Sequence, residues 1–418
     1  MTRVLLLVPT RTYRTADFMA AAARLGVDVV VGSERRNALE ALSAGRTLRV
    51  DLRDPARGAA TIVEYARDRP LDAVVGVDDG STLVAAAAAA ALGLPHNDLD
   101  AVRASRDKAA ARARFAAAGL PTPHHLVVEA DADPRAIIAA GHVRFPCVIK
   151  PIDLSGSQGV IRADDAATFE AAFSRIAAIV RSPTVCPPGT APQRLIVERF
   201  IPGPEVAVEG LIRGGQLEIL AVFDKPDPLD GPFFEETIYV TPSRLAPETL
   251  DSLAAATRAA VRALGLTEGP IHAEFRLAAG GPWVLEVAAR SIGGLCARTL
   301  RFGAGLALEE LILRGAAGLS LPLHDREDAA AGVMMLPISR AGILHEVRGM
   351  ADARAVPGID GLEITVPRGG TVVPLLRGSP RTRSAPFVER EPDADGENPG
   401  SCILDCPGRP DLVTTQQR

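Results

Sequence analysis

The sequence has little of what marks several protein classes. Lys and Arg total 46 against 51 Asp and Glu, a net charge of -5. Nucleic-acid binding through phosphate contacts needs a basic excess, so we expect no nucleic-acid partner. Cysteine occurs five times, a small and odd number that favours reduced thiols over a disulfide framework. Cys402 and Cys406 lack neighbouring metal ligands, and we interpret them as incidental.

Long apolar runs are also missing. The longest, residues 84–94, is mostly alanine and too short to span a bilayer. The run after Arg3 stops at Pro9 with no small-residue cleavage site behind it, which indicates a buried strand and not a signal peptide. We therefore expect a cytoplasmic protein without a membrane partner. No G-x-G-x-x-G follows this run, which disfavours an NAD-dependent oxidoreductase.

Lysine is scarcer still. Of the 46 basic residues only three are lysine: Lys108, Lys150 and Lys225. Lysine is a compact, mobile point charge, whereas arginine is a flat fork suited to bidentate pairing. We interpret Lys150 and Lys108 as functional. The sequence leaves Lys225 undecided, and codon bias is the alternative for all three.

The chain is long enough and apolar enough to form two to three domains. The 418 residues are 47% hydrophobic and 23% charged, as in globular proteins. Continuous β-branched runs in the first hundred residues predict strands buried on both faces, hence a parallel sheet covered by helices. The strands are expected at 3–9, 27–32, 47–52 and 72–79, and the helices at 15–25, 55–67 and 80–92. Gly and Pro in residues 92–98 predict a boundary.

The middle of the chain predicts an antiparallel α+β unit, because its strands follow one another closely. Strand-like segments occur at 145–151, at 270–277, at 282–289 and in four runs between 194 and 243. Helices are expected at 164–181, 246–264 and 305–315. Residues 332–375 indicate a small β-rich addition. The residues after 376 carry no helical or sustained strand pattern, so we expect a largely disordered tail whose removal leaves the fold intact.

Two segments indicate a nucleotide site. Lys150 ends a buried strand, and the SGSQGV turn that follows (155–160) offers backbone N–H groups, hydroxyls and room for a phosphate. A plain hairpin turn is the alternative. Glu198 and Glu205 flank a Pro-Gly turn, an arrangement suited to an adenine amino group and two ribose hydroxyls. Two exposed glutamates on a hairpin are the alternative there.

A third segment indicates a cation site. Glu274 and Glu286 lie in two neighbouring apolar strands and can face the same side. Two inward carboxylates are costly unless a cation lies between them, and Mg²⁺ completes its shell with waters and phosphates. Arg290 follows four residues after Glu286, which predicts the same face, and the SIGG segment (291–294) offers further backbone donors.

Taken in order, six segments resemble the ATP-grasp superfamily of carboxylate–amine ligases. They are DKAAARARFAAAGLPTP, FPCVIKP, SGSQGV, IVERFIPGPEVAVEG, HAEFR and VLEVAARSIGG. The resemblance covers roughly residues 1–376 and is greatest to L-amino-acid (dipeptide) ligases and carnosine-synthase-like enzymes. It implies an α/β N-terminal domain (1–97), a two-lobed α+β ATP-grasp domain (98–320) and a β-rich C-terminal lobe (321–376), followed by the tail (377–418).

The resemblance also implies roles for individual residues. Arg290 would stabilise the transferred phosphoryl group, with Lys150 beside it, while Glu236 and His272 would serve the acceptor side; a packed strand histidine is the alternative for His272. Glu274 and Glu286 would bind one or two Mg²⁺ ions, or Mn²⁺ in their place. The ATP-binding residues would be Lys108, Lys150, Ser155, Gly156, Ser157, Gly159, Glu198, Phe200, Ile201 and Glu205.

Two departures from the family pattern stand out. Ala288 occupies the position where many members carry an asparagine that helps to hold a second metal ion. The tail is also unusual, and either a shifted reading frame near residue 377 or a lineage-specific extension would explain it.

The leading hypothesis is a ligase that joins a small carboxylate to a small amine, both expected to be amino acids, through an acyl phosphate with release of ADP. The alternatives are a biotin-carboxylase-type carboxylase and a nucleotide-binding protein without turnover. The identity of both substrates and a homodimeric state are left open.

Overall fold

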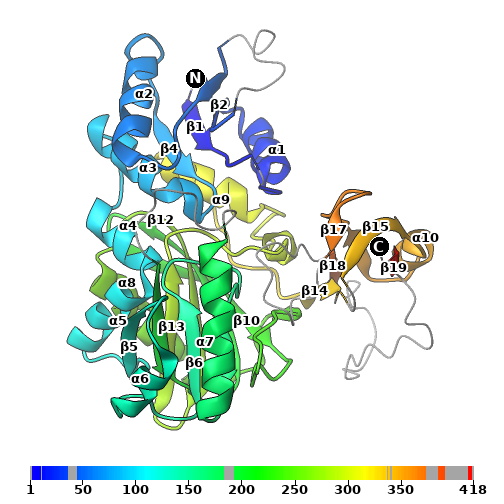
Figure 1. Ribbon diagram of the computed structural model, residues 1–418. Coiled ribbons are helices and arrows are strands. Elements are labelled where there is room, and N and C mark those ends of the chain that lie inside the picture. Colours follow the sequence, from blue (N-terminus) through cyan, green and yellow to red (C-terminus); the bar gives the residue numbers. More distant parts are fainter. Residues whose placement is uncertain are drawn as a thin grey trace.

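A computed structural model describes residues 2–10, 12–35, 45–182, 193–336, 338 and 341–372, together with the backbone of strands 385–390 and 413–416. The N-terminal part lies above a larger body, and the C-terminal strands project to one side (Figure 1). Within the described ranges, no helix is both long and apolar enough to cross a membrane.

The N-terminal part is a parallel sheet with the strand order β3-β2-β1-β4, as the sequence predicts. β1 is central and Leu5, Leu6 and Leu7 are fully buried, because helices cover both faces of the sheet. Asp54 starts its helix by accepting hydrogen bonds from the backbone N–H groups of Ala56 and Arg57. The strands are β1 (Arg3–Leu7), β2 (Asp28–Ser33), β3 (Thr47–Arg49) and β4 (Ala73–Gly76), and the helices are α1 (Thr15–Leu25), α2 (Pro55–Asp68) and α3 (Asp79–Ala91).

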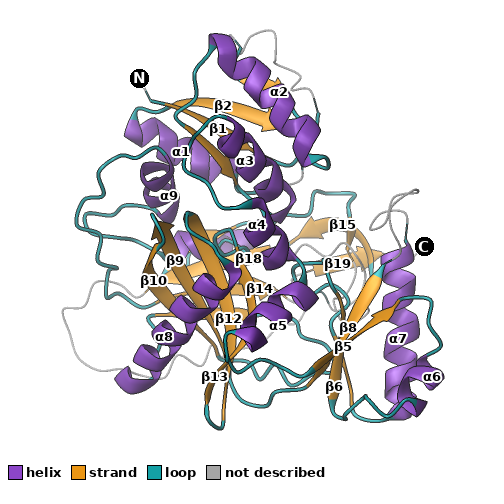
Figure 2. Cartoon of the chain, turned by 90° about the vertical axis from the view of Figure 1, so that its left-hand side faces the viewer, coloured by secondary structure: helices purple, strands orange, loops and turns teal. Residues whose placement is uncertain are grey.

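Two helices, α4 (Leu99–Arg106) and α5 (Lys108–Ala117), lead into a small antiparallel sheet with the order β5-β8-β6-β7. Its strands are β5 (His125–Glu129), β6 (Cys147–Pro151), β7 (Ile161–Ala163) and β8 (Arg194–Arg199), with helices α6 (Pro134–Ala139) and α7 (Ala166–Arg181) beside it (Figure 2). The sequence analysis did not anticipate β5 or α6. β8 belongs to this sheet and does not pair with β9, the next strand along the chain.

The larger sheet has eight strands in the order β13-β12-β9-β10-β11-β14-β18-β16. Helix α8 (Pro247–Leu264) packs on it through Leu253, Val261 and Leu264, and helix α9 (Leu308–Ala316) connects it to the N-terminal part. Its strands from the middle of the chain are β9 (Glu205–Arg213), β10 (Gln216–Lys225), β11 (Ile238–Thr241), β12 (Gly269–Ala278), β13 (Gly281–Ala288) and β14 (Ala331–Leu336).

The C-terminal part completes this sheet and adds a three-stranded one, β17-β15-β19. Two of its strands come from the predicted tail: β18 pairs with β14 and β16, and β19 pairs with β15. The prediction of a tail without strands is therefore wrong for these two segments, because their pairing partners lie far away in the sequence. The rest of 377–418 lies outside the described residues. The elements are β15 (Gly342–Val347), α10 (Met350–Arg354), β16 (Ile359–Leu362), β17 (Thr371–Val372), β18 (Ala385–Arg390) and β19 (Val413–Gln416).

Candidate nucleotide and substrate site

A cavity of about 1170 Å³ lies where the N-terminal part, the β5-β8-β6-β7 sheet and the eight-stranded sheet meet, and residues of the C-terminal part between 365 and 371 also line it. All of the site residues proposed from the sequence line it, although they come from segments up to 182 positions apart. They are Lys108, Lys150, Ser155, Gly156, Ser157, Gly159, Glu198, Phe200, Ile201, Glu205, Glu236, His272, Glu274, Glu286 and Arg290. The structure thus brings the residues together, while the role of each stays a prediction.

One end of the cavity contains a buried cluster of three charges. Lys150 is the last residue but one of β6, and its Nζ lies 2.6 Å from Glu198 Oε2 on the neighbouring strand β8. Arg112 Nε, from α5, donates to the other carboxylate oxygen at 2.6 Å. Burial alone would raise the pKa of Glu198, but Arg112 and Lys150 outweigh it and lower that pKa to about 2. Arg112 carried no signal in the sequence, where it is one of several arginines on a helix.

The predicted phosphate turn is a tight loop between β6 and β7. Gly156, Ser157 and Gly159 all have positive φ angles, from 54° to 72°, so the backbone curls on itself. Lys108 Nζ donates to the carbonyl of Leu154 at the base of this loop at 2.6 Å and lies 3.4 Å from Glu286 Oε2. Lys108 therefore connects the loop to the predicted cation site.

Lys225, which the sequence left undecided, lies beneath the cavity. Its Nζ donates to Glu205 at 2.7 Å, to Glu274 at 2.9 Å and to Glu236 at 3.3 Å. Burial opposes the charge, but the carboxylates raise the pKa of Lys225 well above its ordinary value. Because Arg276 Nε donates to the second oxygen of Glu205 at 3.1 Å, both oxygens of this predicted ribose ligand already have a partner.

Glu274 and Glu286 are directly opposite each other on antiparallel β12 and β13, as the strand alternation predicted. Their side chains are 18% and 26% exposed, and both line the cavity. Two positions further toward Arg290, and so on the same face of the sheet, His272 is opposite Ala288. Within the described residues no group of three or more His, Cys, Asp or Glu could hold a metal ion. Two carboxylates facing a cavity fit a divalent cation that takes its remaining ligands from water and phosphate.

A buried glutamate missed by the sequence analysis connects two parts of the site. Glu209 on β9 is 1% exposed; its Oε1 lies 2.5 Å from His272 Nδ1, and its Oε2 accepts from the Ile292 N–H at 2.9 Å. Burial lowers the pKa of His272, but Glu209 and Glu274 raise it to about 9. His272 is packed in a strand and also lines the cavity, and its role on the acceptor side stays a prediction.

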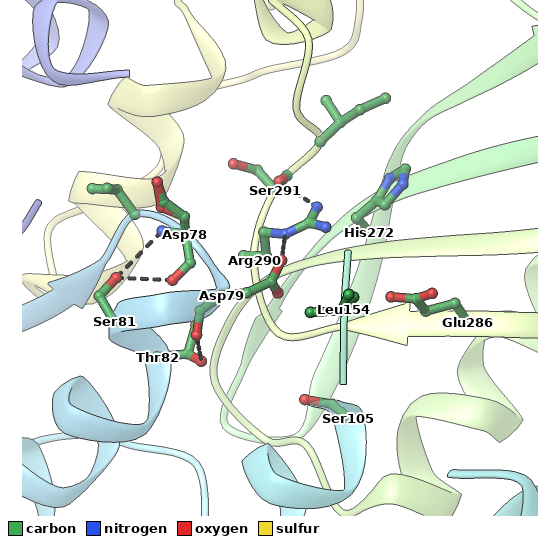
Figure 3. A network of polar contacts seen from close by, with 12 residues as sticks. Asp78, Asp79, Ser81, Thr82, Ser105, Leu154, His272, Glu286, Arg290 and Ser291 are labelled. Atoms are coloured by element: carbon green, nitrogen blue, oxygen red, sulfur yellow. Dashed lines mark hydrogen bonds and ion pairs between the residues drawn. The ribbon is translucent and has the colours of Figure 1, made fainter. Parts of the chain in front are cut away.

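Arg290 lies two residues beyond the end of β13, so the strand alternation expected for it does not apply. It is held from the N-terminal part: its Nε donates to Asp79 Oδ2 at 2.8 Å, and its Nη1 donates to the Ser291 carbonyl at 3.2 Å (Figure 3). Asp79 and Arg290 thereby join two parts of the chain that are 211 positions apart.

The SIGG segment is held in the same way. Arg14 Nη2 donates to the Ser291 carbonyl at 2.9 Å, and Tyr13 Oη accepts from the Gly294 N–H. With Ile292 bound to Glu209, two of the backbone donors predicted to be available here are already used. Tyr13 and Arg14 follow β1 and Asp79 follows β4, and a parallel sheet binds ligands at this position, where its strand order reverses.

Comparison with known proteins agrees with the motif resemblance. Residues 143–299 match the family model of the ATP-grasp domain, and residues 19–96 match that of the ATP-grasp N-terminal domain. A D-alanine–D-alanine ligase of Gloeobacter violaceus is 32% identical over 239 residues, which are 53% of this chain and 72% of that protein. This chain belongs to the ATP-grasp superfamily.

Two further proteins resemble this ATP-grasp chain. An alanine–anticapsin ligase of Bacillus subtilis is 28% identical over 265 residues, 60% of this chain and 55% of that protein. The crystal structure of an L-amino acid ligase from Bacillus licheniformis shares the fold, with a TM-score of 0.77, 24% identity and 93% of each chain covered. The predicted fold class is thereby confirmed. The ATP-grasp chain spans little more than half the length of the curated relatives that it matches first.

Proposed function

We propose that this chain is an ATP-dependent carboxylate–amine ligase that joins two amino acids, with release of ADP and phosphate. One observation carries the proposal. One cavity contains Lys150 and the glycine-rich loop, which suit a nucleotide, together with the opposed carboxylates of Glu274 and Glu286. Arg290, which Asp79 holds in place, lies in the same cavity. The names of the ligases similar to this chain support the same class of reaction.

The reaction begins with transfer of the γ-phosphoryl group of ATP to an oxygen of the substrate carboxylate, which gives an acyl phosphate and ADP. The amine nitrogen then attacks the acyl carbon, the bond from that carbon to the phosphate oxygen breaks, and the amine loses a proton as the amide forms. Both steps need positioned reactants and stabilised charge, with no covalent protein nucleophile.

Different parts of the cavity have different proposed roles. Lys150, Lys108 and the loop 155–159 bind the phosphates, Glu198 with the backbone at Phe200 and Ile201 binds adenine, and Glu205 binds the ribose. Glu274 and Glu286 would hold Mg²⁺, which when bound neutralises charge on the transferring phosphoryl group. Arg290 stabilises the phosphoryl group and the tetrahedral intermediate, and Glu236 and His272 face the acceptor side. Arg112, Lys225 and Glu209 hold these groups in place.

The test is an incubation with ATP, MgCl₂ and single amino acids, with hydroxylamine in place of the natural amine. Hydroxylamine intercepts an acyl phosphate as a hydroxamate, so ADP and hydroxamate should form together. AMP as the nucleotide product, or an absolute need for bicarbonate, would overturn the proposal, and the second outcome would favour the carboxylase. ATP binding without any product would favour the protein without turnover.

A matched pair of variants ties the result to the cavity. Arg290→Ala should lose hydroxamate formation, whereas Arg213→Ala, at an exposed position at the end of β9, should retain it.

A further inference from the structure

Apolar side chains from residues 292–295 and from three other segments line part of the cavity. Tyr239, Ile292 and Leu295 are nearly buried, at 2%, 3% and 4% exposed, and Tyr13 and Met335 complete the lining. We call these five residues the apolar end. Tyr239 faces Val333 across β11 and β14, and Met335 lies two residues after Val333, hence on the same face of the sheet.

Two glycines let this end close tightly. A Cβ atom on Gly294 would collide with the Met335 methyl group, and one on Gly293 would lie 3.0 Å from Tyr13 Oη. Gly294 also has a φ of +64°, which other residues rarely adopt. Tyr13 and Met335 therefore approach the backbone of residues 293–294 from two sides, and Met335 forms the wall contributed by β14.

Several charged groups around the apolar end already have partners, among them Lys225, whose Nζ lies 5.0 Å from the centre of the Tyr239 ring, whereas Asp78 Oδ1 is buried without a hydrogen bond. Arg14 is 7% exposed and donates to the carbonyls of Val77 and Ser291. Asp79 is paired with Arg290, and His272 with Glu209. A charged ligand group placed among these apolar side chains would be desolvated, which costs several kcal/mol, about 2 or more even for a neutral polar group.

We propose that the apolar end receives the side chain of the amino acid whose carboxylate is phosphorylated, and that Met335 sets how long this side chain can be. The inference rests on the proposed ligase function and narrows its substrate to amino acids with uncharged, apolar side chains. Methionine suits such a wall, because its unbranched thioether fits irregular apolar surfaces.

The experiment measures hydroxamate formation from alanine, valine, leucine, methionine, phenylalanine, aspartate and lysine with the natural protein and two variants of opposite size. The natural protein should prefer apolar amino acids over aspartate and lysine. Met335→Ala should raise kcat/KM for phenylalanine relative to valine by about tenfold or more, and Met335→Phe should shift the preference toward alanine, since one methylene in an apolar pocket changes selectivity by roughly 10- to 200-fold.

Met19→Ala is the matched control, the same change at a 39% exposed position on α1, and should leave the ranking unchanged. Opposite shifts in two variants of one residue cannot arise from misfolding. A natural preference for charged amino acids, or one ranking in all the proteins, would overturn the inference and leave the ligase function standing. No hydroxamate from any amino acid with the natural protein would overturn both.

Discussion

Glu198 shows how one residue can serve both stability and binding. It is 3% exposed, and its two carboxylate oxygens form ion pairs with Lys150 and Arg112, so the three side chains form one buried charged cluster. Removing one partner of a buried ion pair leaves an uncompensated charge and typically costs about 3–5 kcal/mol.

The same residue makes stability depend on pH in a defined window. The pKa of Glu198 falls from an ordinary 4.5 to about 2 on folding, so its contribution, about 3 kcal/mol, is present above pH 4.5 and is lost as the pH falls toward 2. We expect Glu198→Gln to destabilise the protein at pH 7 and the difference from the natural protein to shrink toward pH 3. Urea unfolding at both pH values measures this. An equal difference at both would show that Glu198 is not held as a charged group.

Asp79 is a positioning residue for Arg290, because it accepts the hydrogen bond from Nε and thereby fixes the orientation of the guanidinium group. Burial opposes its charge, but Arg290 lowers the pKa of Asp79, which keeps the pair ionised at neutral pH. We expect Asp79→Asn to lower kcat about tenfold or more and to leave the KM for ATP nearly unchanged, since the effect is confined to the transferring group. Steady-state kinetics against Asp68→Asn, an exposed aspartate at the end of α2, tests this. A change in the KM for ATP alone would assign Asp79 to nucleotide binding.

At the scale of elements, the pairing of β12 with β13 creates the cation site. Glu286→Gln keeps the side-chain shape and removes one charge from the opposed pair. Activity should fall by about a hundredfold, and the Mg²⁺ concentration for half-maximal rate should rise, with partial recovery at high Mg²⁺. Glu129→Gln, at an exposed position on β5, should change neither the activity nor the Mg²⁺ concentration for half-maximal rate. An unaltered Mg²⁺ dependence in Glu286→Gln would make Glu286 a structural partner of Lys108.

Local patterns predicted those elements whose signals lie within the element itself. α1 has the expected bounds, and α2, α8, β12 and β13 differ from expectation by one or two residues. α6 also had a readable signal, since Asp133 caps it and Pro134 is its first residue, but the segment is only six residues long. β18 and β19 had none, because a strand that is stabilised by distant partners needs no local alternation.

The residues of the site also differ in whether the sequence alone could reveal them. Residues with a chemical motif, such as Lys150 and Glu286, were found from the sequence, whereas the residues that hold them were not. Arg14 acts on a carbonyl 277 positions away, and Glu209 on an N–H 83 positions away. Neither spacing follows from a local pattern, so only the fold reveals these contacts.

At the scale of the whole molecule, the tail contributes to the larger sheet. β18 lies between β14 and β16. We expect a chain ending at Leu376 to bind ATP with unchanged affinity and to melt at a lower temperature, contrary to the intact stability that the sequence alone suggested. Calorimetric titration and thermal melting measure the two effects. Loss of ATP affinity in the shortened chain would place part of the tail at the site.

The three lysines give this chain an unusual chemical property. An amine-reactive reagent meets, besides the amino group of the first residue, three side-chain targets in 418 residues. Lys108 and Lys150 line the cavity and Lys225 pairs with three of its carboxylates, and none is more than 9% exposed. Because arginine does not acylate under the same conditions, covalent labelling reports on this one place. The extent of labelling at each lysine thus becomes a direct measure of whether the cavity is open, occupied or closed.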